Sequence, residues 1–247
     1  MKVNNTQNEE PLIIQDNGHI RHIILNRPQK LNAIDLAQHE RLMDAFLEGE
    51  RTSNVRVLAL SGMGRAFCAG DDLTASKPRS NERHAKRNVD LEMGQGPSFL
   101  LETCAALHHL KKPTVALMHG VALGSGYDYS LSCDFRLVTP DIRYGDPRID
   151  RALWAAEGWS YKLPRLIQQS LVTPVAYLGK LMDGETAMRY GLVHRIISPE
   201  PDIRTSAMPF LSRLAQIDDK TYRTTKASIT MAVDPTFNQT QAFHAGL

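Results

Sequence analysis

The run HGVALGSGYDYSLSCD, His119 to Asp134, constrains the fold more than any other stretch of this chain. The segment before it, Thr114 to Met118, has the apolar character of a buried strand. Apolar residues at helical spacing follow, namely Leu123, Tyr127 and Leu131. Three glycines punctuate the run, at Gly120, Gly124 and Gly126. The pattern therefore predicts a glycine-rich turn that leads from a strand into a helix.

Such a turn leaves the first N–H groups of the helix without intrahelical partners, at the positive end of the helix dipole. An anion, or an oxygen that becomes anionic during a reaction, is stabilised there. The alternative is that the small residues only let the helix pack closely on a sheet. The run matches neither the Walker pattern, nor G-x-G-x-x-G, nor G-x-S-x-G. We therefore expect Ser125 to contribute its backbone N–H rather than its hydroxyl.

Composition excludes several classes of protein. The chain has 247 residues, 42% of them hydrophobic, and a net charge of +2, which is not typical of nucleic-acid binding. No apolar run approaches the roughly 20 residues of a membrane span, and the polar N-terminus has no signal-peptide core. The three cysteines lack metal-ligand spacing, which favours reduced thiols: Cys68, Cys104 and Cys133. We expect a cytoplasmic protein without metal, membrane or nucleic-acid partners.

The remaining periodicity predicts an α/β protein. A hairpin is expected from Leu12–Gln15 and Ile20–Leu25, and then a helix capped by Asp35 with Gln38 as capping-box partner. That helix has an apolar face of Leu36, Met43, Phe46 and Leu47. Further strands are expected at Val55–Leu60, Phe135–Val138, Ile142–Tyr144 and Val193–Ile197. Further helices are expected at Ser98–Leu110, Trp159–Gln168, Thr173–Lys180, Gly184–Tyr190, Ser206–Leu214 and Tyr222–Met231. The loose recurrence of strand, strand and helix suits α/β layers.

A second glycine turn, GRAFCAGDDL from Gly64 to Leu73, also follows a predicted strand. Residues 74–96 after it are crowded with charge, as in a solvated loop or a mobile wall of a binding site. The two glycine turns lie about fifty residues apart along the chain. Two backbone donors from two such turns are what an oxyanion hole needs.

Four segments together resemble the enoyl-CoA hydratase/isomerase, or crotonase, family, from about Leu12 to Ala232. LNRPQKLNAID, Leu25 to Asp35, resembles the N-R-P-x-x-x-N-A segment of that family. The two glycine turns resemble its two oxyanion loops, the second of which usually reads N-G-x-x-x-G-G-G. GLVHRII, Gly191 to Ile197, resembles its G-L-V-x-x-V-V segment.

The resemblance implies a crotonase-like spiral of repeated ββα units with a helical C-terminal part. It divides the chain into a disordered N-terminus (1–10), a spiral core (11–198) and the helical part (199–247), shorter than usual for the family. It also implies an acyl-CoA substrate, with coenzyme A as part of that substrate and no separate cofactor. The expected assembly is a homotrimer or a dimer of trimers.

Residue by residue, the resemblance makes the N–H groups of Asp71 and Ser125 the two donors to the thioester oxygen. They would stabilise the enolate that forms during the reaction. The positions expected to contact the substrate are Lys30, Asn32, Ala33, Ala69, Gly70, Asp72, Leu73 and Gly124. Lys30 also fits an ordinary surface lysine.

Hydratases of the family use two glutamates to hold one water. The first falls at Asp128, three residues after Ser125 and on the same helical side. Arg148 occupies the second position, and arginine cannot act as a base because it stays protonated. It could bind a second carboxylate or carbonyl of the substrate, or it could pair structurally with Asp146, Asp150 or Asp128.

Further candidates lie nearby. Glu157 is a possible acid, one residue past the position that some relatives use, where Ala156 stands here. Trp154 could wall an acyl pocket or fill core. Tyr127 and Tyr144 are weaker proton-donor candidates.

The sequence thus predicts an acyl-CoA enzyme, hydratase-like in the first instance. A double-bond isomerase, or a hydrolase that cleaves carbon–carbon bonds of an acyl group with a second carboxylate or carbonyl, is the alternative. A non-catalytic binding or assembly module is the alternative from another class, motivated by Arg148 and by the short C-terminal part. RNA binding, known for one family member, is disfavoured by the net charge.

Overall fold

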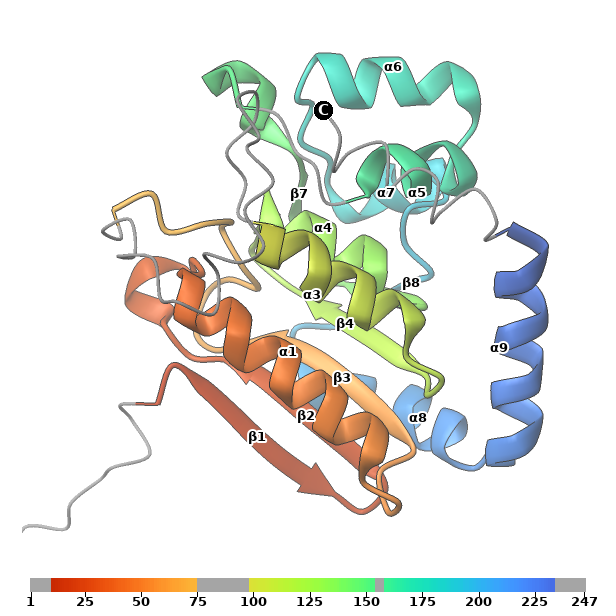
Figure 1. The fold of residues 1–247 in the computed structure, drawn as a ribbon. Helices are drawn as coiled ribbons and strands as arrows, with labels where there is room; N and C mark the ends of the chain where they lie inside the picture. The colour runs from red at the N-terminus through yellow and green to blue at the C-terminus, as the bar shows by residue number, and fades with distance from the viewer. Residues whose placement is uncertain (1–9, 75–97, 154–157, 234–247) are drawn as a thin grey trace, which may run out of the picture.

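The computed structural model describes residues 10–74, 98–153 and 158–233 (Figure 1). Its main sheet has six strands in the order β1-β2-β3-β4-β6-β8. Only β1 runs antiparallel to its neighbour, and the other pairs are parallel. The strands are β1 (Leu12–Asn17), β2 (Ile20–Leu25), β3 (Val57–Gly62), β4 (Thr114–Met118), β6 (Phe135–Val138) and β8 (Arg195–Ile196). Two short strands, β5 (Val121–Leu123) and β7 (Arg143–Gly145), form a second parallel sheet.

Helices lie on both faces of the main sheet, so its central strands are buried on both sides. Alternate residues of β3 show this: Leu58 packs in one hydrophobic cluster and Val57 in the other. The first cluster lies under α1 (Leu36–Arg51), α3 (Ser98–His109) and α4 (Ser125–Ser132). The second lies under α8 (Ile203–Ala215). The remaining helices are α5 (Trp159–Leu166), α6 (Gln169–Tyr177), α7 (Gly184–Tyr190) and α9 (Asp219–Val233).

The predicted α/β class is confirmed, and β2, β4, β6 and α7 have the predicted bounds. The helix within the central run begins at Ser125, so the expectation that Leu123 lies on its apolar face was wrong. Leu123 instead ends β5, a strand of three residues that is too short to show a period of its own. The predicted boundary after residue 198, between the spiral core and the helical C-terminal part, stays a prediction. Trp154, Glu157 and most of the charged segment 74–96 fall outside the described residues.

The first helix differs from its prediction in how its first turn is bonded. Asp35 caps α1 by accepting a hydrogen bond from Gln38 N (3.0 Å), as predicted. The Gln38 side chain, however, donates to Pro11 O (2.8 Å) and does not close a capping box. The buried face is rotated toward His39, Leu42 and Phe46, which places a histidine against the core.

The buried His22 predicts acid sensitivity. It is 6% exposed and lines an open surface pocket of about 480 Å³ with Asp202 and Arg204. Burial and the nearby Arg204 lower the pKa of His22 from its ordinary 6.5. Between the lowered pKa and 6.5 the unfolded chain binds more protons, so the stabilisation is present above 6.5 and is lost as pH falls.

We therefore expect the urea concentration at the unfolding midpoint of the wild type to decrease as the pH is lowered from 7 to 5. Each pH unit between the two pKa values costs up to about 1.4 kcal/mol per group. His22→Gln should remove the part of this dependence that His22 contributes, while the parts contributed by His108 and His194, whose pKa values burial also lowers, should remain. Equal slopes for wild type and His22→Gln would contradict the assignment.

Candidate functional site

The structure brings the two glycine turns into direct contact. Cys68 N donates to Val121 O (3.0 Å), and Leu123 N donates to Cys68 O (2.9 Å). Gly126 lies so close that a methyl group there would be 2.7 Å from both Cβ and O of Cys68. Only glycine permits this approach, so the first turn rests directly on the start of α4.

The Asp71 N–H is directed away from its neighbouring segment by the backbone pairing around it. Ile34 N donates to Gly70 O (2.9 Å) and Asp72 N donates to Ile34 O (2.8 Å), which uses the peptide groups on either side of Asp71. Within the described residues, the N–H of Asp71 donates to no protein group.

The Ser125 N–H is the first donor of α4. Gly124 precedes it at φ 52° and ψ −121°, a conformation that favours glycine, and supplies no side-chain cap. The Ser125 N–H has no acceptor in the part of the chain that the structure describes. A methyl group placed on Gly70, the residue before Asp71, would lie 3.7 Å from Ser125 N, so the turn that carries Asp71 passes close to the Ser125 amide. The arrangement has the two neighbouring donors that an oxyanion hole requires.

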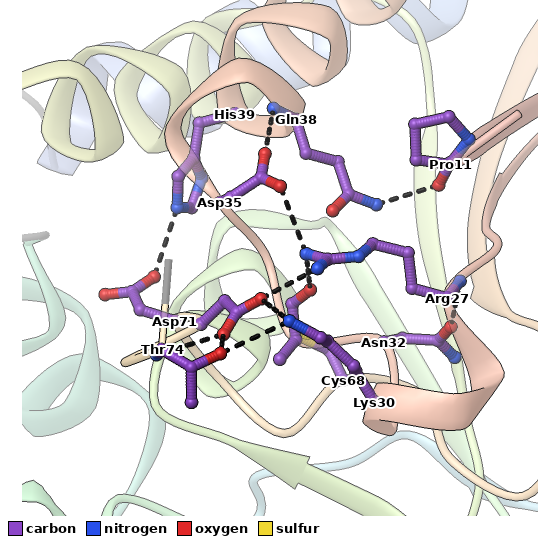
Figure 2. Close-up of polar contacts among 12 residues, drawn as sticks. Pro11, Arg27, Lys30, Asn32, Asp35, Gln38, His39, Cys68, Asp71 and Thr74 are labelled. Carbon is purple, nitrogen blue, oxygen red and sulfur yellow. Dashed lines mark hydrogen bonds and ion pairs between the residues drawn. The ribbon is translucent and has the colours of Figure 1, made fainter. Parts of the chain in front are cut away.

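Side chains form a connected network above the same two turns. The Ser125 hydroxyl donates to Asp71 Oδ1. The sequence had predicted a role for the backbone N–H of Ser125 and none for its hydroxyl. His39 Nε2 lies 3.1 Å from the same Asp71 oxygen, and His39 Nδ1 lies 2.6 Å from the Tyr129 hydroxyl. Figure 2 shows His39 reaching from α1 toward Asp71. His39 was not among the residues predicted from the sequence, although its spacing from Leu42 and Phe46 places it on the buried face of α1.

The ionisation of the Asp71 carboxylate determines which nitrogen of His39 carries the proton. Burial acts to raise the pKa of Asp71, but the hydrogen bonds from His39 and Ser125 outweigh it and leave the pKa below its ordinary value. An ionised carboxylate only accepts hydrogen bonds. His39 Nε2 is therefore assigned the proton, and Nδ1 accepts from the Tyr129 hydroxyl.

Asp128 and Arg148 form a buried ion pair. The Asp128 side chain is 0% exposed, and its Oδ2 lies 2.6 Å from Arg148 Nη2. The same nitrogen lies 2.7 Å from Asp146 Oδ2, and Arg148 Nε donates to Asp146 Oδ1 (2.7 Å). Of the arrangements left open by the sequence, the structure shows pairing with Asp128 and Asp146. A role of Arg148 in holding a substrate carboxylate stays a prediction, and these two carboxylates compete for its charge.

Lys30 and Asp72, two of the positions predicted to contact the substrate, belong to a second polar cluster, in which Figure 2 shows Lys30 beside Thr74. Lys30 Nζ lies 2.7 Å from Asp72 Oδ2, which also accepts from Arg27 Nη2 (2.7 Å). The contact with Lys30, together with bonds from Thr74 and Arg27, lowers the pKa of Asp72. Lys30 remains 42% exposed, and Leu73 is 67% exposed. Lys30 thus has a structural partner, and its predicted role in substrate binding stays a prediction.

Asn32 connects this cluster to the first glycine turn. It is fully buried at φ 56°, and its amide nitrogen donates to Met63 O (2.9 Å) and Ala66 O (2.7 Å). Its carbonyl oxygen accepts from Arg27 N (2.9 Å). Nearby, Ala33 O accepts from Arg27, and Ala69 N donates to Leu31 O (3.0 Å). In this structure Asn32 holds the loop in place.

Other reactive groups near the site are held in their protonated forms. Burial raises the pKa of the Cys68 thiol to about 12, which makes it a poor nucleophile. Burial also raises the pKa of Tyr144 to about 12 and that of Tyr127 well above its ordinary value. The Tyr144 hydroxyl lies 2.7 Å from Ser130 Oγ.

The described residues carry neither a metal-binding cluster nor a membrane-spanning helix. No group of three or more histidine, cysteine or acidic side chains within the described ranges could hold a metal ion. No helix in the same ranges is both long and apolar enough to cross a bilayer.

Comparison with known proteins shows the family of this chain. The family model for enoyl-CoA hydratase/isomerase matches residues 15–247. The (E)-benzylidenesuccinyl-CoA hydratase of Thauera aromatica is 26% identical over 227 residues, which cover 91% of this chain and 84% of the relative. The mitochondrial Δ(3,5)-Δ(2,4)-dienoyl-CoA isomerase of Mus musculus is 29% identical over 192 residues, covering 76% and 59%. A crystal structure of enoyl-CoA hydratase from Bacillus anthracis superposes with a TM-score of 0.79 at 28% identity, covering 95% of this chain and 89% of that one. The chain belongs to the enoyl-CoA hydratase/isomerase family, and its relatives include both hydratases and isomerases.

Proposed function

We propose that this protein acts on an acyl-CoA thioester whose carbonyl oxygen is held by the N–H groups of Asp71 and Ser125. The observation that carries the proposal is the contact between the two turns, which brings close together the segments that carry these two amides, neither of which has an acceptor among the described residues. Charge that develops on the oxygen when an enolate forms is stabilised there. Coenzyme A arrives as part of the substrate.

The reaction we propose is hydration or dehydration of an enoyl thioester, with Asp128 as one acid–base group. Its position on α4, three residues after Ser125, supports this role. Isomerisation of a double bond is the second candidate, because it needs only one base and because one relative is named as an isomerase. Glu157 remains a candidate acid.

A panel of thioesters tests the proposal. Crotonyl, dienoyl and β-keto thioesters of coenzyme A are each incubated with the protein, and hydration, isomerisation and cleavage are followed separately. Turnover of at least one identifies the reaction. Intact binding of coenzyme A thioesters without turnover of any would favour the non-catalytic module.

Asp128→Asn is expected to lower kcat by about 10²-fold, since acid–base catalysis by one positioned group is typically worth that much. The dissociation constant of the thioester should change far less, because asparagine keeps the shape of the side chain and an acceptor for Arg148. The measurement is kcat beside thioester binding by calorimetry, with Asp16→Asn on the distant hairpin as the control. Wild-type turnover in Asp128→Asn would remove Asp128 from the mechanism.

A distal carboxylate on the acyl group is the substrate feature that Arg148 would recognise. One relative is named for a succinyl thioester, a type of acyl group that carries such a carboxylate. Comparing kcat/KM for thioesters with and without the distal carboxylate tests this. No preference would assign Arg148 to its ion pairs with Asp128 and Asp146 alone.

We further propose a cytoplasmic homotrimer or dimer of trimers. Large apolar side chains at the end of α6 support association, because Tyr177 and Leu178 are 71% and 69% exposed. Ile149, 44% exposed, lies close to Gly179, the residue after Leu178, because a methyl group on Gly179 would be 3.0 Å from Ile149 Cγ2. Light scattering after gel filtration measures the subunit number.

A further inference from the structure

We infer that the side chain of Asp71 is a second acid–base carboxylate of the site, taking the role that Arg148 cannot fill. The inference rests on the proposed function, because it assigns a proton-transfer group to the same pocket. From the sequence, only the backbone N–H of Asp71 was predicted to take part, as a donor to the thioester oxygen.

The two oxygens of the Asp71 carboxylate have different surroundings. Oδ1 accepts from both Ser125 and His39, which fixes the orientation of the group. Oδ2 accepts no hydrogen bond from any described residue, and the side chain is 36% exposed. Asp128, by contrast, is 0% exposed and bound to Arg148. Asp71 is therefore the more accessible of the two carboxylates.

Asp71 also stands in the right place. Its own N–H is one of the two proposed donors to the thioester oxygen, and its Oδ1 accepts from the hydroxyl of Ser125, which carries the other donor, so the carboxylate lies next to the proposed position of that oxygen. Arg148, which holds Asp128, lies close to the same turn, because a methyl group on Gly124 would be 3.4 Å from Gly70 Cα and 4.0 Å from Arg148 Nε. Asp128 and Asp71 thus both lie near the start of α4, and the charge of Arg148 also acts on Asp71.

The hydration step balances with Asp71 as the proton carrier, while Asp128 accepts a hydrogen bond from the attacking water and orients it. Oδ2 accepts a proton from water while the water oxygen bonds to the β carbon, and the double-bond electrons move onto the thioester oxygen between the two amides. Asp71 then returns the proton to the α carbon, and the C=O bond re-forms. Negative charge moves from the carboxylate to the thioester oxygen and back, so the carboxylate and the enolate are never ionised together.

His39 and Tyr129 are positioning residues for this carboxylate. Tyr129 accepts a side-chain hydrogen bond from Thr103 and donates to His39, which in turn donates to Asp71. In this series of hydrogen bonds, each residue donates toward the next one, and the series ends at Asp71. Loss of the His39 donor should raise the pKa of Asp71, and the acid limb of the kcat/KM profile should then move to higher pH.

The first experiment compares Asp71→Asn and Asp71→Ala with wild type on the best thioester of the panel. Both variants keep the backbone N–H, and asparagine keeps an acceptor for Ser125. We expect kcat to fall about 10²-fold in both, with KM within threefold. Urea midpoints and thioester binding establish that each variant is folded. Wild-type kcat in a folded Asp71→Asn protein would overturn the inference, and so would a loss confined to KM.

The second experiment uses His39→Gln and His39→Leu as a matched pair. Glutamine retains a donor near the Nε2 position, whereas leucine retains only bulk. The acid limb should move upward in His39→Leu and return toward wild type in His39→Gln. Superimposable pH profiles of kcat/KM for wild type and both folded variants would overturn the positioning role of His39. Absence of wild-type turnover on every thioester would instead count against the proposed function, which separates the two failures.

Discussion

Replacing Ser125 with proline is expected to lower kcat by about 10²- to 10³-fold, the loss typical of one missing oxyanion donor, roughly 3–4 kcal/mol. Proline has no N–H, so the change deletes the proposed donor itself. The fold should tolerate it, because Ser125 is the first residue of α4, where proline is favoured. Gly124 before it has ψ −121°, outside the α region that a following proline disfavours.

Ser125→Ala is the matched control for this experiment. It removes the hydroxyl bond to Asp71 but keeps the amide, and its kcat should fall less than tenfold. Steady-state kinetics on one thioester, with binding measured in parallel, separates lost catalysis from a blocked pocket. Full activity in a folded Ser125→Pro protein would exclude the amide from the mechanism.

Arg148→Met is expected to destabilise the fold by about 3–5 kcal/mol, because it leaves a buried carboxylate without the cation that binds it. The structure places that cation 2.6 Å from Asp128, whose side chain is 0% exposed. Methionine keeps most of the aliphatic bulk, so the loss reports charge rather than volume.

A double-mutant cycle isolates the ion pair. Combining Arg148→Met with Asp128→Asn should recover a large part of the lost stability, since the buried negative charge is then removed as well. Arg151→Met, at an exposed position of the same turn, should change the urea midpoint little. Strictly additive losses would show that Asp128 and Arg148 are not energetically coupled.

The parts of the fold that depend on local pattern could be predicted from the sequence. Val57 and Leu58 belong to a β-branched and leucine-rich run, and Asp35 has the chemistry of a helix cap. The three glycines of the central run predicted a strand-to-helix turn because close approach and positive φ favour glycine. Residues 69–71 and 124–126 could be expected near each other only through the family resemblance.

The polar contacts of the site could not be predicted in the same way. His39 meets Asp71 across 32 residues, and Arg148 meets Asp128 across 20. Such pairs depend on how far α1 is rotated and on where the turn after β7 places its first side chain. A rotation of α1 by one residue would move His39 off the core, and periodicity alone does not fix that angle.

The contact of Gly126 with Cys68 also limits how such a protein can change its substrate. No methyl group fits between these two segments, so neither loop can drift without carrying the other with it. New acyl preferences must therefore arise by exchanging side chains around a fixed backbone frame. If the amides of Asp71 and Ser125 hold the thioester oxygen as proposed, a change of reaction is expected to come from the acidic and basic side chains around them.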